Sequence, residues 1–146
     1  HLPYMLDIEN QKVDDYAQTP FETLTLMKGD CEDHAILVAQ LLSLLCYEPA
    51  LIWLVSKVDQ ASGHMTAGIK SSQVRTKVEE WFSTSLENPL EYKINNTPYY
   101  NLEATPCVNS ACVSTIGEGE EAITEKYSFL RGFEVLNVCA YEPELE

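Results

Sequence analysis

A chain of 146 residues can bury a sizeable apolar core, and we expect residues 1–146 to form a single domain. Nine Lys and Arg residues stand against 23 Asp and Glu residues, which gives a formal net charge of −14 at pH 7. This charge excludes nucleic acid and anionic membranes as electrostatic partners, and no apolar run is long enough to span a bilayer.

The first residues contain neither the basic region nor the apolar stretch of a signal peptide, and the chain begins with His1 instead of an initiator methionine. We therefore expect a piece of a longer protein. The ends do not identify the compartment, and our interpretation favours an extracytoplasmic or cell-surface location for that longer protein. The oligomeric state stays open.

The cysteine count is odd, so at least one thiol is unpaired if the others form disulfides within the chain. Cys31 is our candidate for the free thiol. Two of the others are close in sequence and either close a small disulfide loop or stay reduced. The five are Cys31, Cys46, Cys107, Cys112 and Cys139, of which Cys107 and Cys112 are the close pair.

The first predicted helix follows residues 1–20, which we expect to form a loop or short helix over the core. Thr19 is the predicted N-cap, Pro20 suits the first helical position, and Glu22 completes a capping box with Thr19. This pattern predicts a short helix that ends near Met27.

The strongest helix signal lies in residues 28–46. Asp30 is the predicted N-cap, and Asp33 stands three residues later in the manner of a capping box. The apolar residues that follow point to nearly every side, which predicts a core helix surrounded by other elements. Cys31 therefore stands in the first turn of this helix.

The predicted strands follow the core helix. Residues 50–55 read as a buried strand and residues 64–70 as its antiparallel partner, in which Gly68 indicates a bulge or a close backbone approach. We expect a third strand near residues 77–83, followed by loops, and a fourth over residues 99–105 that Pro106 stops.

The last quarter of the chain predicts an acidic turn at residues 117–121, a helix over residues 121–130 and an edge strand over residues 133–141. With the core helix before most of the strands, the fold class is α+β. We expect that N-terminal core helix to pack on an antiparallel sheet.

A helix N-terminus stabilises an anion and so lowers the pKa of a thiol such as Cys31. Three neighbouring carboxylates, Asp30, Glu32 and Asp33, oppose this effect because negative charge disfavours a second anion. An imidazolium close to Cys31 would favour the thiolate, so the histidines decide the interpretation.

Three histidines are present, and His1 is terminal. His34 lies on the same helix as Cys31 and is expected to pack or to form hydrogen bonds. His64 opens a strand after a glycine-containing turn, where it could face Cys31 across a cleft, and is the predicted base. Glu103 on a later strand is the predicted partner that fixes the tautomer of His64.

These residues resemble the transglutaminase-like superfamily, which includes cysteine peptidases and protein-modifying acyltransferases on a papain-like fold. Microbial members commonly carry Gly-Asp-Cys-Glu-Asp at the start of the core helix, as at residues 29–33, and a histidine at the head of a following strand, as at His64. Residues 102–105 contain the acidic residue that stands before a threonine in family members. Residues 17–24 resemble the sequence that precedes the core helix in the family. The similarity covers roughly residues 4–117.

Two positions depart from the family pattern. The third member of the triad is usually aspartate, and Glu103 is one methylene longer. The helix commonly ends in glycine before an aromatic residue, where this chain has Cys46. A cysteine tolerates a left-handed cap poorly, so we expect a different helix end.

The resemblance implies that the Cys31 thiolate attacks an amide carbonyl of a protein or peptide, with no cofactor or metal, and that His64 protonates the leaving amine. Water or a second amine then resolves the thioester, so hydrolysis, deamidation and cross-linking stay open. The N–H of Cys31 holds part of the oxyanion. A second donor to the oxyanion, from a side chain upstream of the cysteine, is typical of such sites. Tyr4 and Gln18 are the candidates for it.

Two alternatives remain. In the first, the chain is a binding module in which zinc is held by Cys31, His34, Cys107 and Cys112. In the second, the chain keeps the family fold without catalysis and binds a peptide or a partner chain. The first gives His64 and Glu103 no role.

Overall fold

The structure is a computed structural model, and it describes residues 2–7, 16–56, 63–82, 90–104 and 133–140. Three helices and five strands are defined within these residues. In chain order they are α2 (Pro20–Leu26), α3 (Cys31–Leu44), β1 (Pro49–Ser56), β2 (Gly63–Lys70), α4 (Ser71–Phe82), β3 (Glu91–Ile94), β4 (Thr97–Leu102) and β5 (Phe133–Ala140).

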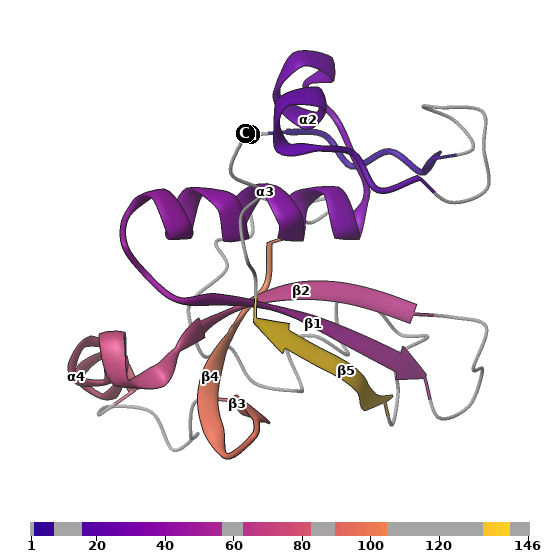
Figure 1. Cartoon of the computed structure of the whole chain (residues 1–146). Coiled ribbons are helices and arrows are strands. Elements are labelled where there is room, and N and C mark those ends of the chain that lie inside the picture. The colour runs from indigo at the N-terminus through magenta and orange to yellow at the C-terminus, as the bar shows by residue number, and fades with distance from the viewer. Residues whose placement is uncertain (1, 8–15, 57–62, 83–89, 105–132, 141–146) are drawn as a thin grey trace.

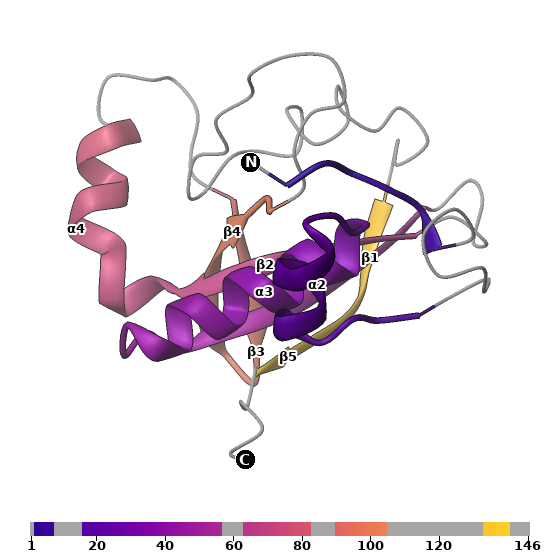
Figure 2. The same cartoon turned by 90° about the horizontal axis from the view of Figure 1, so that it is seen from above.

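The strands form one sheet in the order β3-β4-β2-β1-β5, and each neighbouring pair is antiparallel. Helix α3 lies across one face of this sheet over β2 and β1, and α2 packs on α3 on the side away from the sheet (Figures 1 and 2). The predicted α+β fold with a core helix on an antiparallel sheet is therefore confirmed. None of the helices in the described ranges is long and apolar enough to cross a membrane.

Helix α2 begins as the sequence predicts. The Thr19 N–H donates to Glu22 Oε2 at 2.8 Å, and the Glu22 N–H donates to Thr19 Oγ1 at 3.3 Å. The two bonds form the predicted capping box and satisfy two of the N–H groups that a helix start leaves open.

Helix α3 is enclosed over only part of its length. Its first half is buried as predicted, with Ala35 and Ala39 fully inaccessible, whereas Leu41 and Leu44 near its end are exposed. The expectation of burial on all sides is wrong for the second half, because α2 covers only the beginning of the helix (Figure 2).

Helix α3 ends with Cys46 in the left-handed region, at φ 64°. The Cys46 N–H donates to the Ser43 carbonyl at 3.0 Å and the Tyr47 N–H to the Leu42 carbonyl at 3.0 Å, which is the Schellman arrangement. The expectation of a different helix end is wrong, because these two bonds hold the cysteine in a conformation that usually belongs to glycine.

Replacing Cys46 with glycine is therefore expected to stabilise the domain by about 1 kcal/mol, since glycine adopts this conformation without a Cβ penalty. Urea denaturation measures the change. Ser43→Gly, inside the same helix, is the control and is expected to destabilise by a similar amount. A loss of stability in Cys46→Gly would show that the left-handed conformation of Cys46 is not strained.

Residues 71–82 form helix α4, so the strand expected near residues 77–83 is wrong. Val74 and Val78 lie four residues apart and pack against Ile69 and Tyr100, which is helical spacing. Charged residues on the other side add an ion pair four residues apart, Arg75 to Glu79 at 3.6 Å. The short charged segment hid this period in the sequence.

Strands β3 and β4 form a hairpin where loops were expected before residue 99. Its turn is made by Asn95 and Asn96, with φ values of 46° and 68°. Asparagine tolerates this region, and two such residues are typical of a tight hairpin turn. Strand β4 ends at Leu102 and not at residue 105.

The remaining strand predictions agree with the structure. β1 pairs with β2 as expected, and β5 is an edge strand beside β1. A Cβ at Gly68 would lie 2.9 Å from Ile52 Cδ1, so this glycine leaves room for the Ile52 side chain; the register at Gly68 shows neither a bulge nor a shift. The predicted turn and helix between residues 117 and 130 lie outside the described residues, as do Cys107 and Cys112.

Candidate active site

Cys31 is the first residue of α3, and a buried carboxylate holds the turn that presents it. Asp33 is fully buried and accepts three N–H groups: Gln18 N at 2.7 Å, Gln18 Nε2 at 2.6 Å and Asp30 N at 3.2 Å. A Cβ at Gly29 would lie 2.6 Å from Asp33 Cβ, so the glycine makes room for this carboxylate. The segment before the helix is thereby fixed at its N-cap.

His64 and Glu103 meet from two strands. His64 is the second residue of β2, and Glu103 follows the last residue of β4. His64 Nε2 and Glu103 Oε2 lie 2.7 Å apart, with the two side chains 2% and 0% exposed. The Thr66 hydroxyl donates to the Leu102 carbonyl at 2.7 Å and holds the end of β4 against β2. The longer side chain of glutamate therefore spans the distance to the imidazole.

Cys31 lies against the same strand as His64. Helix α3 packs on β2, and the backbone N–H of Met65, the residue after His64, is near enough to the Cys31 sulfur to lower the pKa of the thiol. The structure thus brings the predicted thiol and the predicted histidine to one place, the head of β2.

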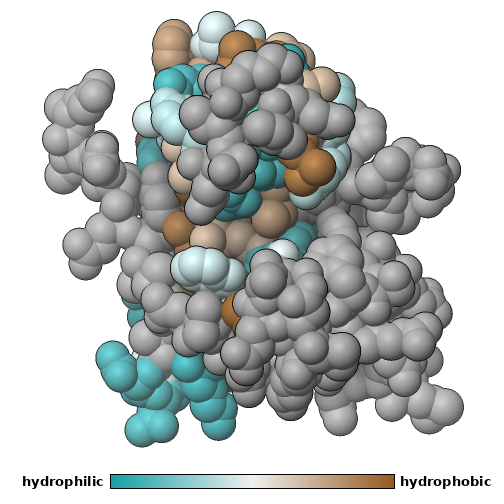
Figure 3. All heavy atoms as spheres, turned by 90° about the vertical axis from the view of Figure 1, so that its right-hand side faces the viewer, coloured by the Kyte–Doolittle hydropathy of each residue, from teal (hydrophilic) through white to brown (hydrophobic). Residues whose placement is uncertain are grey.

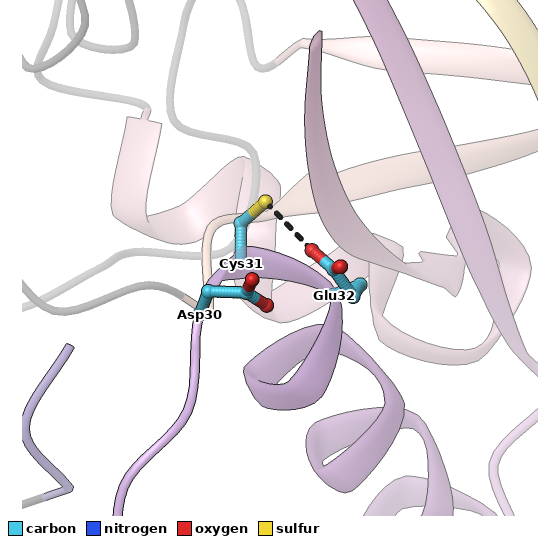
Figure 4. Close-up of side chains that lie close together, drawn as sticks. All are labelled: Asp30, Cys31 and Glu32. Atoms are coloured by element: carbon cyan, nitrogen blue, oxygen red, sulfur yellow. Dashed lines mark hydrogen bonds between the residues drawn. The ribbon is translucent and has the colours of Figure 1, made fainter. Parts of the chain in front are cut away.

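The charge around Cys31 differs from the sequence expectation. Burial raises the pKa of the Cys31 thiol well above its usual range, the Glu32 carboxylate raises it further, and the Met65 N–H lowers it. Glu32 Oε2 lies 3.2 Å from the sulfur, and Figure 4 shows the two side chains meeting at the start of α3. These effects outweigh the pKa-lowering effect of the helix N-terminus. The resting side chain of Cys31 is therefore a thiol, which donates a hydrogen bond to Glu32.

The neighbouring carboxyl groups are buried as well. Burial, followed by Glu32, raises the pKa of Asp30 to about 8, so Asp30 keeps its proton at neutral pH. Burial also raises the pKa of Asp33, while the N–H groups of Gln18 and Asp30 lower it. A protonated Asp30 reduces the negative charge next to Cys31.

His34 has a structural role. Its Nδ1 lies 2.5 Å from the Asp30 carbonyl, and its Nε2 lies 3.3 Å from the Leu2 carbonyl. Both partners are acceptors, and a neutral imidazole carries one N–H, so the ring donates to one of these two carbonyls. The ring thus faces the backbone that leads into α3, an arrangement that does not favour His34 as a zinc ligand.

Two groups of side chains each place three potential metal ligand atoms within 4.8 Å of one another: Asp30 with Cys31 and Glu32, and Asp7 with Asp30 and Asp33. We assign no ion to either group. The oxygens of Asp33 already accept three N–H groups, and the hydrogen bond to the thiol accounts for the position of Glu32.

Sequence reasoning gave two contributors to this site a different role. Glu32 contacts the sulfur, although it had been considered only as one of three nearby charges. Gln18 had been a candidate donor to the oxyanion, whereas it anchors Asp33 through two bonds, a role that a polar residue ahead of a capped helix could have suggested. The Met65 N–H carries no sequence signal, because every residue except proline has one.

The arrangement defines a class of protein: an α+β domain with a thiol at the start of its core helix and a buried histidine–carboxylate pair on the adjacent strands. The model of one family, described as a transglutaminase-like domain, matches residues 3–75, half of the chain. The chain therefore belongs to the transglutaminase-like family, whose members are typically cysteine-dependent acyltransferases or peptidases. The match includes Cys31 and His64 and stops before Glu103. A comparison with curated proteins gave no match.

Proposed function

We propose that this domain catalyses thiol-dependent acyl transfer or hydrolysis at peptide or amide bonds through a thioester on Cys31. The observation that carries the proposal is the buried pair of His64 and Glu103 beside the first turn of α3. A buried pair of this kind is expensive to desolvate and is a poor source of stability. Its position next to a thiol supports a catalytic role.

The pair also sets the proton positions that the reaction needs. With Glu103 as acceptor, the Nε2 of His64 carries a hydrogen, and a neutral imidazole then has its lone pair on Nδ1. In the proposed reaction that nitrogen takes the proton of the Cys31 thiol. Glu103 thus acts through His64 as a positioning residue.

In the proposed reaction, His64 takes the proton of the thiol while the Cys31 sulfur bonds to the amide carbonyl carbon. The carbonyl electron pair moves onto the oxygen and returns when the C–N bond breaks. The amine leaves with the proton from His64, and the thioester remains. Because burial and Glu32 raise the pKa of the thiol, the proton moves during the attack and not before it.

Water or a second amine then attacks the thioester and restores the thiol. Hydrolysis is the default, because excluding water requires a dedicated site. Figure 3 shows the end of the molecule at which α3 begins, where apolar and polar residues lie side by side.

The test compares two thiols of one chain. Cys46 is exposed and serves as an internal reference for Cys31, which is less exposed. Iodoacetamide labelling near neutral pH is measured at both thiols by mass spectrometry of the peptides, and the rate at Cys46 is the reference for the rate at Cys31. In His64→Ala, labelling of Cys31 is expected to slow by about a hundredfold, because the base is lost, while labelling of Cys46 keeps its rate.

Equal rates for Cys31 in the two proteins would overturn the proposal and favour a non-catalytic binding module of the same fold. Zinc found by elemental analysis would favour the metal-bound alternative. A peptide library incubated with and without a primary amine then distinguishes the outcomes of catalysis, since cleavage, deamidation and amine incorporation change peptide masses differently.

A further inference from the structure

Large apolar side chains are exposed on the side of the molecule that carries α2 and α3. Figure 2 looks down on this side, where α2 lies over the first half of α3 and leaves the second half uncovered. Phe21 on α2 is 76% exposed, and Leu44 on α3 is 69% exposed. We call this surface the α2–α3 face, and its residues are Phe21, Leu24, Met27, Leu41, Leu44 and Leu45.

The helical repeat makes this face continuous along α3. Leu42 packs against the core cluster that contains Ile69 of β2, so its side of the helix faces the sheet. Leu37, Leu41 and Leu44 have the spacing of a single row on the opposite side. Leu37 in the first half is buried, whereas Leu41 and Leu44 are exposed. The apolar row therefore continues into solvent beyond the part of α3 that α2 covers.

The α2–α3 face carries little charge, although the chain has a net charge of −14. Residues 35–47 contain no charged side chain. Glu22 is the charged residue of α2, and its carboxylate accepts from the Thr19 N–H at 2.8 Å and from the Tyr16 hydroxyl at 2.9 Å. Because so acidic a chain repels its own copy, a second copy approaches best where like charges do not meet.

The size of the face suits a partner as large as a protein. Its six side chains together present roughly 600 Å² of apolar surface, at the upper end of the ~300–600 Å² that the largest patch of a monomer reaches. Each partner in a standard stable interface contributes roughly 800 Å². The face with a rim of neighbouring residues therefore provides the area that a dimer needs.

We propose that the α2–α3 face binds the same face of a second copy of this chain across a two-fold axis. In such a pairing each residue of the face is used twice and the contact closes, so the product is a dimer and not a filament. Burial of the exposed leucines drives the association. The pairing goes beyond the proposed function and does not depend on it.

Analytical ultracentrifugation of two Leu44 variants tests the pairing. In Leu44→Glu the dissociation constant of the dimer is expected to rise by about a hundredfold or more, because the two-fold axis places two charges in the desolvated contact. Glutamate and leucine have similar helix propensities, so α3 is retained. Leu44→Lys reduces the net negative charge and suits the helix C-terminus, and it is expected to weaken the dimer as well.

The matched control is Ser72→Glu. Ser72 is exposed in the first turn of α4, outside the α2–α3 face, so this variant has the same net charge as Leu44→Glu. Its dissociation constant is expected to stay within about twofold of the wild-type value, since a single exposed charge contributes little. Iodoacetamide labelling of Cys31 at the wild-type rate in Leu44→Glu would show that the fold around the thiol is intact.

Salt gives an independent measurement. Between about 0.01 and about 1 M salt the Debye length falls from roughly 30 to roughly 3 Å, which screens the repulsion between acidic copies, so the dimer is expected to tighten. A dimer that weakens with salt, or that persists in both Leu44 variants, would overturn the proposal. A wild-type protein that stays monomeric at about 1 mM would overturn it too, and would assign the face to a different partner.

Discussion

Replacement of Glu103 by glutamine is expected to slow acylation of Cys31 by about a thousandfold or more. Glutamine fills the same volume, but its amide can turn a donor toward His64 Nε2, which lies 2.7 Å from the carboxylate in the wild-type protein. The imidazole then carries its proton on Nδ1 and cannot accept the thiol proton there. Acylation by p-nitrophenyl acetate measures the loss.

The readout that separates positioning from a structural role is the tautomer of His64, which ¹⁵N NMR of the imidazole reports. We expect the hydrogen to move from Nε2 to Nδ1 in Glu103→Gln, and Glu103→Asp to restore part of the rate. Glu48→Gln is the matched control: Glu48 is exposed and pairs with Lys70 at 2.6 Å, and its loss should leave the rate unchanged. An unchanged tautomer in a slow Glu103→Gln protein would contradict this role.

Replacement of Asp33 by asparagine is expected to lower the free energy of unfolding by about 2–4 kcal/mol. The carboxylate accepts three N–H groups in a fully buried position, two from Gln18 and one from Asp30. An amide offers only one acceptor oxygen, so at least one N–H faces another donor. Urea denaturation with an unchanged m-value measures the loss.

The matched control for Asp33→Asn is Glu22→Gln, in the capping box of α2. Glu22 accepts from the Thr19 N–H at 2.8 Å on the surface, and glutamine keeps that acceptor. We expect a change below about 1 kcal/mol. Equal losses in the two variants would show that burial of Asp33 adds nothing to its bonds.

Local signals predicted the parts of the fold that depend on neighbouring residues. The capping boxes of α2 and α3 and the strands β1 and β2 follow from residues close together in the chain. The order of Cys31, His64 and Glu103 also indicated which side chains to bring together. Helix α4 was misread as a strand, because its two core-facing valines are helically spaced within a charged segment too short to reveal the period.

The tertiary structure decided what depends on residues far apart in sequence. The sequence motif predicts that Cys31 begins a helix. Burial and the Glu32 side chain, however, decide that the pKa of its thiol is raised and not lowered. The role of Gln18 likewise depends on its two bonds to Asp33, which lies 15 residues later in the chain. The sequence alone indicated the family, the starts of α2 and α3 and the order of the reactive residues. The protonation states of these residues and the distances between them depend on burial and on contacts between distant segments. A sequence pattern carries no information on either.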